Sequence, residues 1–266
     1  MAIPSKFVPK PQNSSYSLGN QEGSGSGYLS EESKEIEVQK KEESKDLEAQ
    51  KKEEKKGEPK PEKVKRKIDE DFLDLQMTAE EDVSNWNKVC ESEEVTVYRK
   101  KTEGTPMVMI KADAILQGIP KDIVFKAIYD TDIRQQWDKL FHEFEVVEHD
   151  EKKMETVLYY SIKAPFGVSN RDFLQKRKVI HDFPKEGITY MHFKSIEHDK
   201  KPPVKKVVRA ETIISGYIME QIKDNPPITK LTVISQNDIK GLIPKYLVNM
   251  ASGKAPKQWV GNLITG

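Results

Sequence analysis

The feature that most constrains the fold is a succession of strand-like segments in the second half of the chain, separated by turn-forming stretches. The segments lie at roughly residues 143–149, 154–163, 173–182, 187–196, 206–221 and 229–237. Strands that follow one another through short turns pair antiparallel, so these segments predict an antiparallel sheet. Gly216 lies inside the longest segment. It predicts a bend there, because glycine weakens regular strand structure.

Two earlier strands and several helices complete the predicted pattern. Strands are predicted at 95–100 and 107–116, and helices at 120–129, at about 132–141 and from 245 to about 264, interrupted near Gly253 and Pro256. Thr78, followed by acidic residues, predicts the N-cap of a further helix carrying Val83 and Trp86, with residues 71–75 as the approach to it. These elements predict an α+β fold in which a curved antiparallel sheet wraps around a long C-terminal helix.

The composition changes sharply near residue 70. Residues 1–69 hold 15 Lys and Arg and 14 Asp and Glu, and they include an eleven-residue unit that occurs at 33–43 and again at 44–54. Such a segment buries too little apolar surface to offset the entropy of ordering its backbone. We therefore expect a disordered, charged, low-complexity arm over residues 1–69 and one domain over residues 70–266, which contain every tryptophan.

Charge and motif content exclude several functions. The 29 basic and 30 acidic residues of the domain nearly balance, which argues against nucleic acid as a partner. The lone Cys90 excludes an internal disulfide and a cysteine-ligated zinc site. No catalytic motif, metal-ligand spacing, signal peptide or apolar run of ~18 residues is present. The sequence therefore predicts a cytoplasmic chain that is not an enzyme and needs no cofactor or metal.

Arg134 and Asp138 are the first candidate binding residues, because their i,i+4 spacing places them on one face of a helix. Spacing alone favours a solvated face, where such a pair contributes about 0.3–0.5 kcal/mol. A buried pair would instead leave guanidinium donors free for a phosphate or another polar headgroup.

The second candidate is the turn-rich stretch 164–170, in which Pro165 and Gly167 flank Phe166. It suits a hinged apolar tip, and equally a plain turn with Phe166 packed inward.

Three segments carry a family resemblance: residues 130–138 (DTDIRQQWD), residues 155–173 (ETVLYYSIKAPFGVSNRDF) and residues 240–249 (KGLIPKYLVN). They resemble the steroidogenic-acute-regulatory-related lipid-transfer (START) domain, and are most similar to its phosphatidylcholine-transfer branch. The resemblance implies a helix-grip fold with an internal tunnel for one lipid, roofed by the C-terminal helix.

The resemblance also implies roles for individual residues. Arg134 and Asp138 match a buried pair that meets the lipid phosphate. Tyr160 and Phe173 match two aromatic residues of a choline cage, whose third member falls at about Ile213, where this chain is aliphatic. Residues 164–170, with Pro165, Phe166 and Gly167 at their centre, match a gate to the tunnel.

We expect a protein that binds a single lipid, a glycerophospholipid, and transfers it between membranes after transient contact with their surfaces. The expected partners are therefore a phospholipid ligand and a peripheral membrane contact, with no nucleic acid. An alternative is a lipid-sensing adaptor whose disordered arm recruits a protein partner. A third hypothesis, an enzyme, finds no ionisable group in the sequence poised as its acid or base.

Overall fold

The computed structural model describes residues 68–102, 108–164, 167–241 and 245–266, with side chains of the last helix described from Lys254 onward. Arg66–Gly266 forms one compact unit. The arm expected over residues 1–69 lies, apart from its last two residues, outside the described residues, so its disorder stays a prediction.

The described helices are α2 (Glu70–Glu80), the short 3-10 helix η1 (Val83–Asn85), α3 (Lys121–Tyr129), α4 (Thr131–Trp137) and α5 (Lys245–Thr265). The described strands are β1 (Asn87–Glu91), β2 (Val95–Lys101), β3 (Val108–Gln117), β4 (Glu143–Asp150), β5 (Glu155–Ile162), β6 (Asn170–His181), β7 (Ile188–Ser195), β8 (Val207–Arg209), β9 (Glu211–Asp224) and β10 (Pro227–Asp238).

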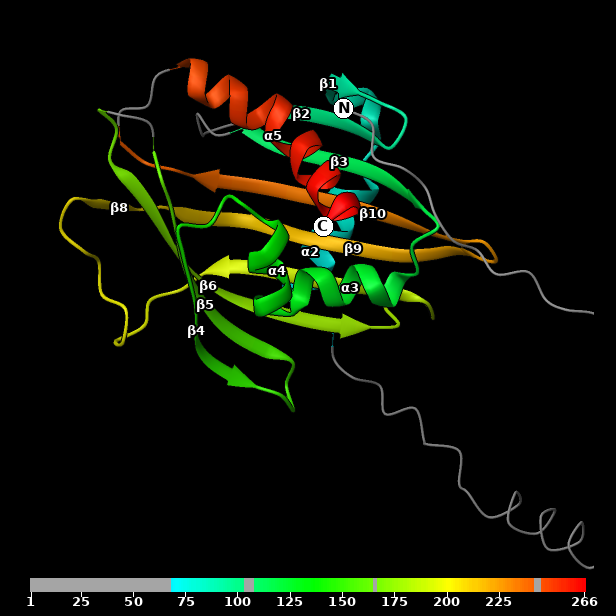
Figure 1. Cartoon of the computed structure of the whole chain (residues 1–266), viewed down its shortest axis with the longest axis horizontal. Coiled ribbons are helices and arrows are strands. Elements are labelled where there is room, and N and C mark those ends of the chain that lie inside the picture. Colours follow the sequence, from blue (N-terminus) through cyan, green and yellow to red (C-terminus); the bar gives the residue numbers. More distant parts are fainter. Residues whose placement is uncertain (1–67, 103–107, 165–166, 242–244) are drawn as a thin grey trace, which may run out of the picture. The chain divides into compact units, whose positions relative to one another are not determined.

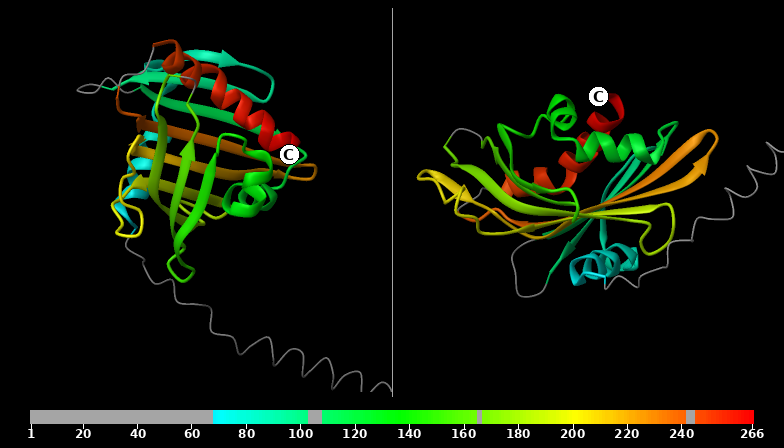
Figure 2. Two further views of the ribbon diagram at one scale, coloured as in Figure 1. Left: turned by 60° about the vertical axis from the view of Figure 1, so that its left-hand side comes forward. Right: turned by 90° about the horizontal axis from the view of Figure 1, so that it is seen from below.

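The strands form one ten-stranded sheet in the order β1-β2-β3-β10-β9-β7-β6-β5-β4 (Figure 1). All neighbours along this path pair antiparallel, while the short β8 pairs in parallel with the start of β6. The sheet is curved, and α5 lies across its concave face together with α3 and α4 (Figure 2). The predicted α+β helix-grip architecture is confirmed.

The two faces of the sheet carry separate apolar cores. Trp137, Trp259 and Leu263 pack with the inward-facing residues of the strands on the concave face. On the opposite face, α2 places Phe72 and Leu75 against the strands (Figure 2). The concave face therefore holds both the larger core and, between the sheet and α5, the space available for a ligand.

The helix predicted from Thr78 is wrong, because the first helix of the domain is α2 and the chain beyond Glu81 forms η1 and β1. Asp69 caps α2 by accepting a hydrogen bond from the N–H of Asp71. The hydroxyl of Thr78 donates to the carbonyl of Asp74 within α2 rather than capping a new helix. Residues 71–75, which were expected to lead into the first helix of the domain, thus lie inside that helix, α2.

The long strand predicted over 206–221 is two strands, β8 and β9, which are separated at Ala210, whose N–H donates to the carbonyl of Asp172. β9 continues through Gly216, where the sequence predicted a bend. Gly216 has another role, because a Cβ atom there would lie 2.3 Å from Cδ2 of Leu75 and 2.8 Å from the carbonyl oxygen of Met191. Glycine therefore permits the close approach of α2 to β9.

The predicted interruption of the C-terminal helix is also wrong, since α5 runs from Lys245 to Thr265 with Pro256 inside it. A proline removes one backbone hydrogen bond from a helix. The buried side chains of Trp259 and Val260 hold the following turns against the sheet.

An ionic cluster fixes α2 to the outer face of the sheet. Lys178 lies 2.7 Å from carboxylate oxygens of both Asp69 and Asp71, and Lys194 lies 3.0 Å from Asp71. Partial burial raises the pKa of Asp71, but the hydrogen bonds from Lys178 and Lys194 outweigh this effect and lower the pKa to about 2.

We expect Gly216→Ala to lower the free energy of unfolding by about 1–3 kcal/mol, because the new methyl group overpacks the contact with Leu75. Gly261→Ala is the matched control, since a Cβ atom at this position of α5 would meet nothing within 4 Å. The control should raise stability by about 0.5–1 kcal/mol. Urea unfolding measures both, and equal effects of the two substitutions would contradict the close-approach role.

We also expect Asp71→Asn to flatten the acid side of the stability profile. The folded pKa of Asp71 is about 2 and an unfolded aspartate titrates near 3.9, so its contribution is present above pH ~4 and is lost as the pH falls toward 2. Allowing for solvent screening, this contribution is about 1 kcal/mol. Asp74→Asn, on the exposed side of α2, serves as the control and should leave the profile unchanged.

Candidate functional site

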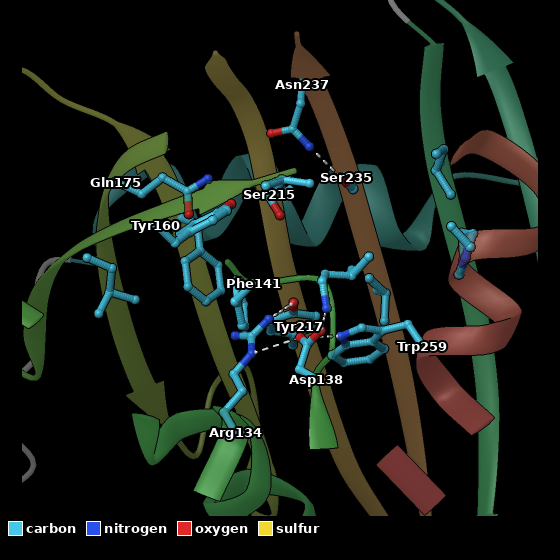
Figure 3. A pocket seen from close by; sticks show the side chains of 18 of the residues that line it. Arg134, Asp138, Phe141, Tyr160, Gln175, Ser215, Tyr217, Ser235, Asn237 and Trp259 are labelled. Atoms are coloured by element: carbon cyan, nitrogen blue, oxygen red, sulfur yellow. Dashed lines mark hydrogen bonds and ion pairs between the residues drawn. The ribbon is translucent and has the colours of Figure 1, made fainter. Parts of the chain in front are cut away.

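The concave face of the sheet encloses a cavity of about 220 Å³ between the strands, the segment after α4, and α5. Its lining is mainly apolar and aromatic, with an ion pair and a few uncharged polar groups (Figure 3). The apolar lining residues are Ile110, Ala112, Leu140, Phe141, Phe144, Leu158, Ile162, Phe193, Val233, Ala255 and Pro256. An apolar space with few polar groups is typical of small-molecule sites.

Arg134 and Asp138 lie in this lining and are 7% and 3% exposed, so the alternative of a solvated face is excluded. Nε of Arg134 lies 3.3 Å from Oδ2 of Asp138, and Nη2 donates to the hydroxyl of Tyr217 at 3.0 Å. Within the part of the chain that the structure describes, these are the guanidinium's only protein partners. Three of its five N–H donors therefore remain available to a ligand.

Local structure explains how the pair is placed. Asp130 caps α4 by accepting hydrogen bonds from the N–H groups of Asp132 and Ile133. Nε1 of Trp137 donates to the carbonyl of Ala127 at 3.0 Å, which fixes α4 against α3. Asp138 is the C-cap residue of α4, so its carboxylate leaves the helix end beside the last-turn Arg134.

The carboxylate of Asp138 has three donors. Besides Arg134, Nε1 of Trp259 donates to Oδ2 at 2.8 Å, and the N–H of Leu140 donates to Oδ1 at 3.3 Å. The indole of Trp259 also stacks on the ring of Tyr217, with centroids 5.2 Å apart. Trp259 therefore joins α5 to the ion pair.

The environment of Arg134 favours its charged form. Burial opposes the charge, but Tyr217 and Asp138 more than offset this, so the pKa of the guanidinium is raised. Its Cζ lies 5.1 Å from the ring centre of Phe141, 5.6 Å from that of Tyr217 and 6.0 Å from that of Trp259. Aromatic faces at these distances attract a cation, so the site holds a permanent positive charge in an apolar space.

Tyr160 and Phe173 lie directly opposite each other on β5 and β6, and their rings stack with centroids 4.8 Å apart. Tyr160 lines the cavity, and burial raises the pKa of its hydroxyl. Phe173 is buried behind Tyr160 and does not line the cavity. Ile213, at the position of the third expected cage residue, is 42% exposed and lies outside the lining as well.

The expected gate can be followed only in part. Pro165 and Phe166 lie outside the described residues, so neither the hinged tip nor the plain turn is decided. Gly167 is exposed and has φ +85°, a value that favours glycine. The N–H of Ala164 donates to Oδ1 of Asn170 across the stretch.

Beyond the stretch, the adjacent charged residues Arg171 and Asp172 have different partners. Asp172 accepts two hydrogen bonds from Arg209, at 3.0 and 2.9 Å. Arg171 instead donates to the carbonyls of Ile239 and Lys240, shortly before α5.

Sequence reasoning missed a row of uncharged polar groups in the cavity, namely Gln175, Ser215, Ser235 and Asn237 (Figure 3). Nδ2 of Asn237 donates to the hydroxyl of Ser235 at 2.8 Å, and its Oδ1 accepts from Thr212 at 2.6 Å. The strand period was the one signal that could have identified such a group. Ser215 and Tyr217 are two residues apart on β9, so their side chains face the same side of the sheet, the side of the cavity.

Among the described residues, no group of three or more His, Cys, Asp or Glu side chains is placed to hold a metal ion. His192 is buried in β7, and burial lowers its pKa. None of the helices in the described residues is long and apolar enough to span a membrane.

The chain is similar in sequence to known proteins. Mouse START domain-containing protein 10 is 28% identical over 194 residues, covering 72% of this chain and 64% of that protein, so the chain spans less than two thirds of that relative. Mouse phosphatidylcholine transfer protein is 24% identical over 184 residues, covering 68% of this chain and 83% of that protein.

Solved structures match as well. The crystal structure of human STARD10 has a TM-score of 0.66 at 25% identity and covers 77% of this chain and 82% of its own. Human StAR-related lipid transfer protein 5 has a TM-score of 0.65 at 21% identity, with coverage of 74% and 92%, and supports the fold. The family model of the START domain matches residues 69–261, and the chain therefore belongs to the START domain family.

Proposed function

We propose that the chain binds one lipid, a glycerophospholipid, in the cavity of the concave face and transfers it between membranes without chemical reaction. The observation that carries the proposal is a buried guanidinium in an apolar cavity, with three N–H donors that have no protein acceptor among the described residues. A phosphate suits Arg134, because charge-assisted hydrogen bonds are strongest where water is excluded. The matched relatives named as lipid transfer proteins support the same class of activity.

The acyl chains would supply most of the affinity. Each methylene group removed from water contributes about 0.8 kcal/mol, so an apolar enclosure needs few specific contacts along the chains. The cavity of about 220 Å³ is smaller than the ~300–1,000 Å³ usual for pockets of drug-sized ligands. Lipid binding therefore requires the lining of α5 or of the sheet to move outward, which is expected to occur in peripheral contact with a membrane.

The cavity offers fewer specific contacts to the group attached to the phosphate than to the phosphate itself. The rings of Phe141, Tyr217 and Trp259 already face the guanidinium of Arg134. The other aromatic lining residues are Phe144, Tyr160 and Phe193, and of these Tyr160 is the one that the family resemblance assigns to a quaternary ammonium. We propose that the phosphate fixes the ligand and that choline adds only a modest increment.

The N-terminal arm stays a separate proposal. A partner protein recruited by the arm, residues 1–69, would make the chain a lipid-sensing adaptor, and residues 1–67 of the arm lie outside the described structure. Deleting them should leave vesicle-to-vesicle transfer in place if the domain alone carries the activity. Pull-downs with the full chain and the shortened chain measure any loss of partner binding.

The first prediction concerns the ion pair. Arg134→Met alone leaves a buried, uncompensated carboxylate and should cost about 3–5 kcal/mol of stability. The double variant Arg134→Met/Asp138→Asn removes both charges and keeps an amide oxygen for Trp259. It should fold but lose phospholipid binding and transfer at least about tenfold, since hydrogen bonds to charged groups contribute roughly 1.5–3 kcal/mol each.

The matched control for this experiment lies on α3. Asp122 and Lys126 share the i,i+4 spacing but are exposed, so Asp122→Asn/Lys126→Met makes equivalent changes on a solvated face. Native mass spectrometry of co-purified lipid and a vesicle transfer assay measure the outcome. Undiminished phospholipid binding by the folded Arg134 double variant would exclude the phosphate role of Arg134.

The second prediction concerns choline. Tyr160→Leu should weaken the binding of phosphatidylcholine relative to phosphatidic acid by about 0.5–2 kcal/mol, the range of a cation–π contact. Phe173→Leu should have a smaller effect, because Phe173 stacks behind Tyr160 without lining the cavity. Competition between the two lipids in the binding assay gives the ratio, and an unchanged ratio for Tyr160→Leu would show that this ring does not meet the headgroup.

A further inference from the structure

The uncharged polar groups of the cavity belong to one chain of hydrogen bonds across three strands. Nε2 of Gln175 on β6 donates to the hydroxyl of Thr212 on β9, and that hydroxyl donates to Oδ1 of Asn237 on β10 at 2.6 Å. Nδ2 of Asn237 then donates to the hydroxyl of Ser235 at 2.8 Å. Each group donates to the next, so the chain ends in the O–H of Ser235, for which the described residues provide no acceptor.

Burial strengthens the end of this chain as a donor. Gln175 is 4% exposed and Thr212 is 2% exposed, so the bonds that lead to Ser235 lie away from water. Linked hydrogen bonds in a low-dielectric interior polarise one another, which makes the last O–H a better donor. A donor that is buried without an acceptor is costly. Whatever occupies the cavity beside Ser235 is therefore expected to bring an acceptor.

Ser215 doubles this group, because it lies directly opposite Ser235 on the neighbouring strand β9. Side chains paired in this way have Cβ atoms about 4.5–5.5 Å apart, so the two hydroxyls, here called the serine pair, form one polar spot on the cavity wall. The hydroxyl of Ser215 has no hydrogen-bond partner among the described residues. The next residues in the same row across the sheet are apolar, with Phe193 beside Ser215 and Ile110 beside Ser235.

The serine pair has a fixed relation to the charged part of the cavity. Tyr217, whose hydroxyl accepts from Arg134, follows Ser215 by two residues, a step of about 7 Å along β9. Figure 3 shows the uncharged polar side chains toward one end of the cavity and Arg134 toward the other. A ligand whose phosphate meets Arg134 therefore places a neighbouring part of the same molecule at the serine pair.

The donors of the serine pair decide which part of a phospholipid fits. A hydrocarbon chain would leave both hydroxyls unpaired. A cationic headgroup has no acceptor to offer, and its charge is repelled by the positive end of an O–H dipole. The ester groups, which follow the phosphate after the glycerol carbons, carry carbonyl oxygens that accept hydrogen bonds without bringing a charge.

We propose that the serine pair, Ser215 and Ser235, is the subsite for the ester carbonyl groups of the lipid, and that it makes the cavity select diacyl lipids over their ether-linked analogues. An ether linkage lacks the carbonyl oxygen and would leave the two donors unpaired. A site built to hydrogen-bond a ligand group rejects the analogue that lacks it. This inference rests on the proposed function, because it takes the phosphate to lie at Arg134.

The test uses the full chain and vesicles that contain equal amounts of a diacyl and a dialkyl phosphatidylcholine with chains of the same length. Native mass spectrometry gives the ratio of the two lipids taken up. Ser215→Ala/Ser235→Ala removes the serine pair, and Ser215→Thr/Ser235→Thr keeps both hydroxyls. The matched control, Ser84→Ala/Ser161→Ala, removes two hydroxyls that do not line the cavity.

We expect the unaltered chain and the control variant to take up the diacyl lipid in preference, and the alanine variant to lower the ratio of diacyl to dialkyl lipid by about tenfold, as for the loss of one or two hydrogen bonds. The threonine variant should keep the preference. Equal uptake of both lipids by the unaltered chain, or an unchanged ratio in the alanine variant, would overturn the subsite. Loss of the preference in the threonine variant would also overturn it, because packing rather than the hydroxyls would then set the ratio.

Failure of this proposal can be told apart from failure of the proposed function. A chain that takes up phospholipid without preference for the ester excludes the serine pair as the subsite and leaves the phosphate role of Arg134 standing. Undiminished phospholipid uptake by Arg134→Met/Asp138→Asn contradicts the phosphate role instead. In that variant the ratio of diacylglycerol to dialkylglycerol taken up still tests the serine pair, because neither of these lipids carries a phosphate.

Discussion

The interaction on which the rest of the site depends is the buried ion pair between Arg134 and Asp138. It joins three parts of the fold. Arg134 lies in α4 and Asp138 is the C-cap of that helix, while Tyr217 from β9 accepts from Arg134 and Trp259 from α5 donates to Asp138. Removing two charges from water is costly, and a buried pair is stable only when its remaining donors and acceptors are satisfied. The carboxylate meets this condition with three donors, whereas the guanidinium meets it only in part.

This asymmetry is consistent with the ligand-binding role proposed for Arg134. A structural pair would be expected to satisfy both partners, yet three N–H donors of Arg134 have no protein acceptor among the described residues. Unsatisfied donors alone do not mark a ligand site, because Arg177, on β6, is also buried and its Nε has no partner among the described residues. Arg177 caps α3 by donating to the carbonyl of Tyr129, and its Cζ lies 3.8 Å from the ring centre of that residue. What differs is position, because Arg134 lines the cavity and Arg177 does not. The charge of Arg177 stabilises a helix end, while that of Arg134 faces a cavity.

The sequence predicted the features that depend on neighbours along the chain and missed those that depend on distant ones. The strand-like segments and the turn-forming stretches between them predicted β5, β6 and β7 close to their observed bounds, because strand and turn composition are local properties. The spacing of Arg134 and Asp138 was equally local, but their burial was not: Trp259, which covers Asp138, follows it by 121 residues. The start of the first helix was missed because an apparent cap at Thr78 competed with the actual cap at Asp69.

The family resemblance supplied the arrangement that patterning could not, and the structure adds a constraint to it. Trp259 donates to Asp138 from the helix that covers the cavity, so displacing α5 to admit a large ligand would remove a donor from a buried carboxylate. That loss raises the energy of the open, empty state, since a buried acceptor without its partner costs about 1–3 kcal/mol or more when charged. An anionic ligand group that accepts hydrogen bonds from Arg134 would offset this cost, because the ion pair then loses the hydrogen bond from Trp259 and gains those to the ligand. Under the proposed function, opening of the cavity and headgroup binding would therefore be coupled through the carboxylate of Asp138.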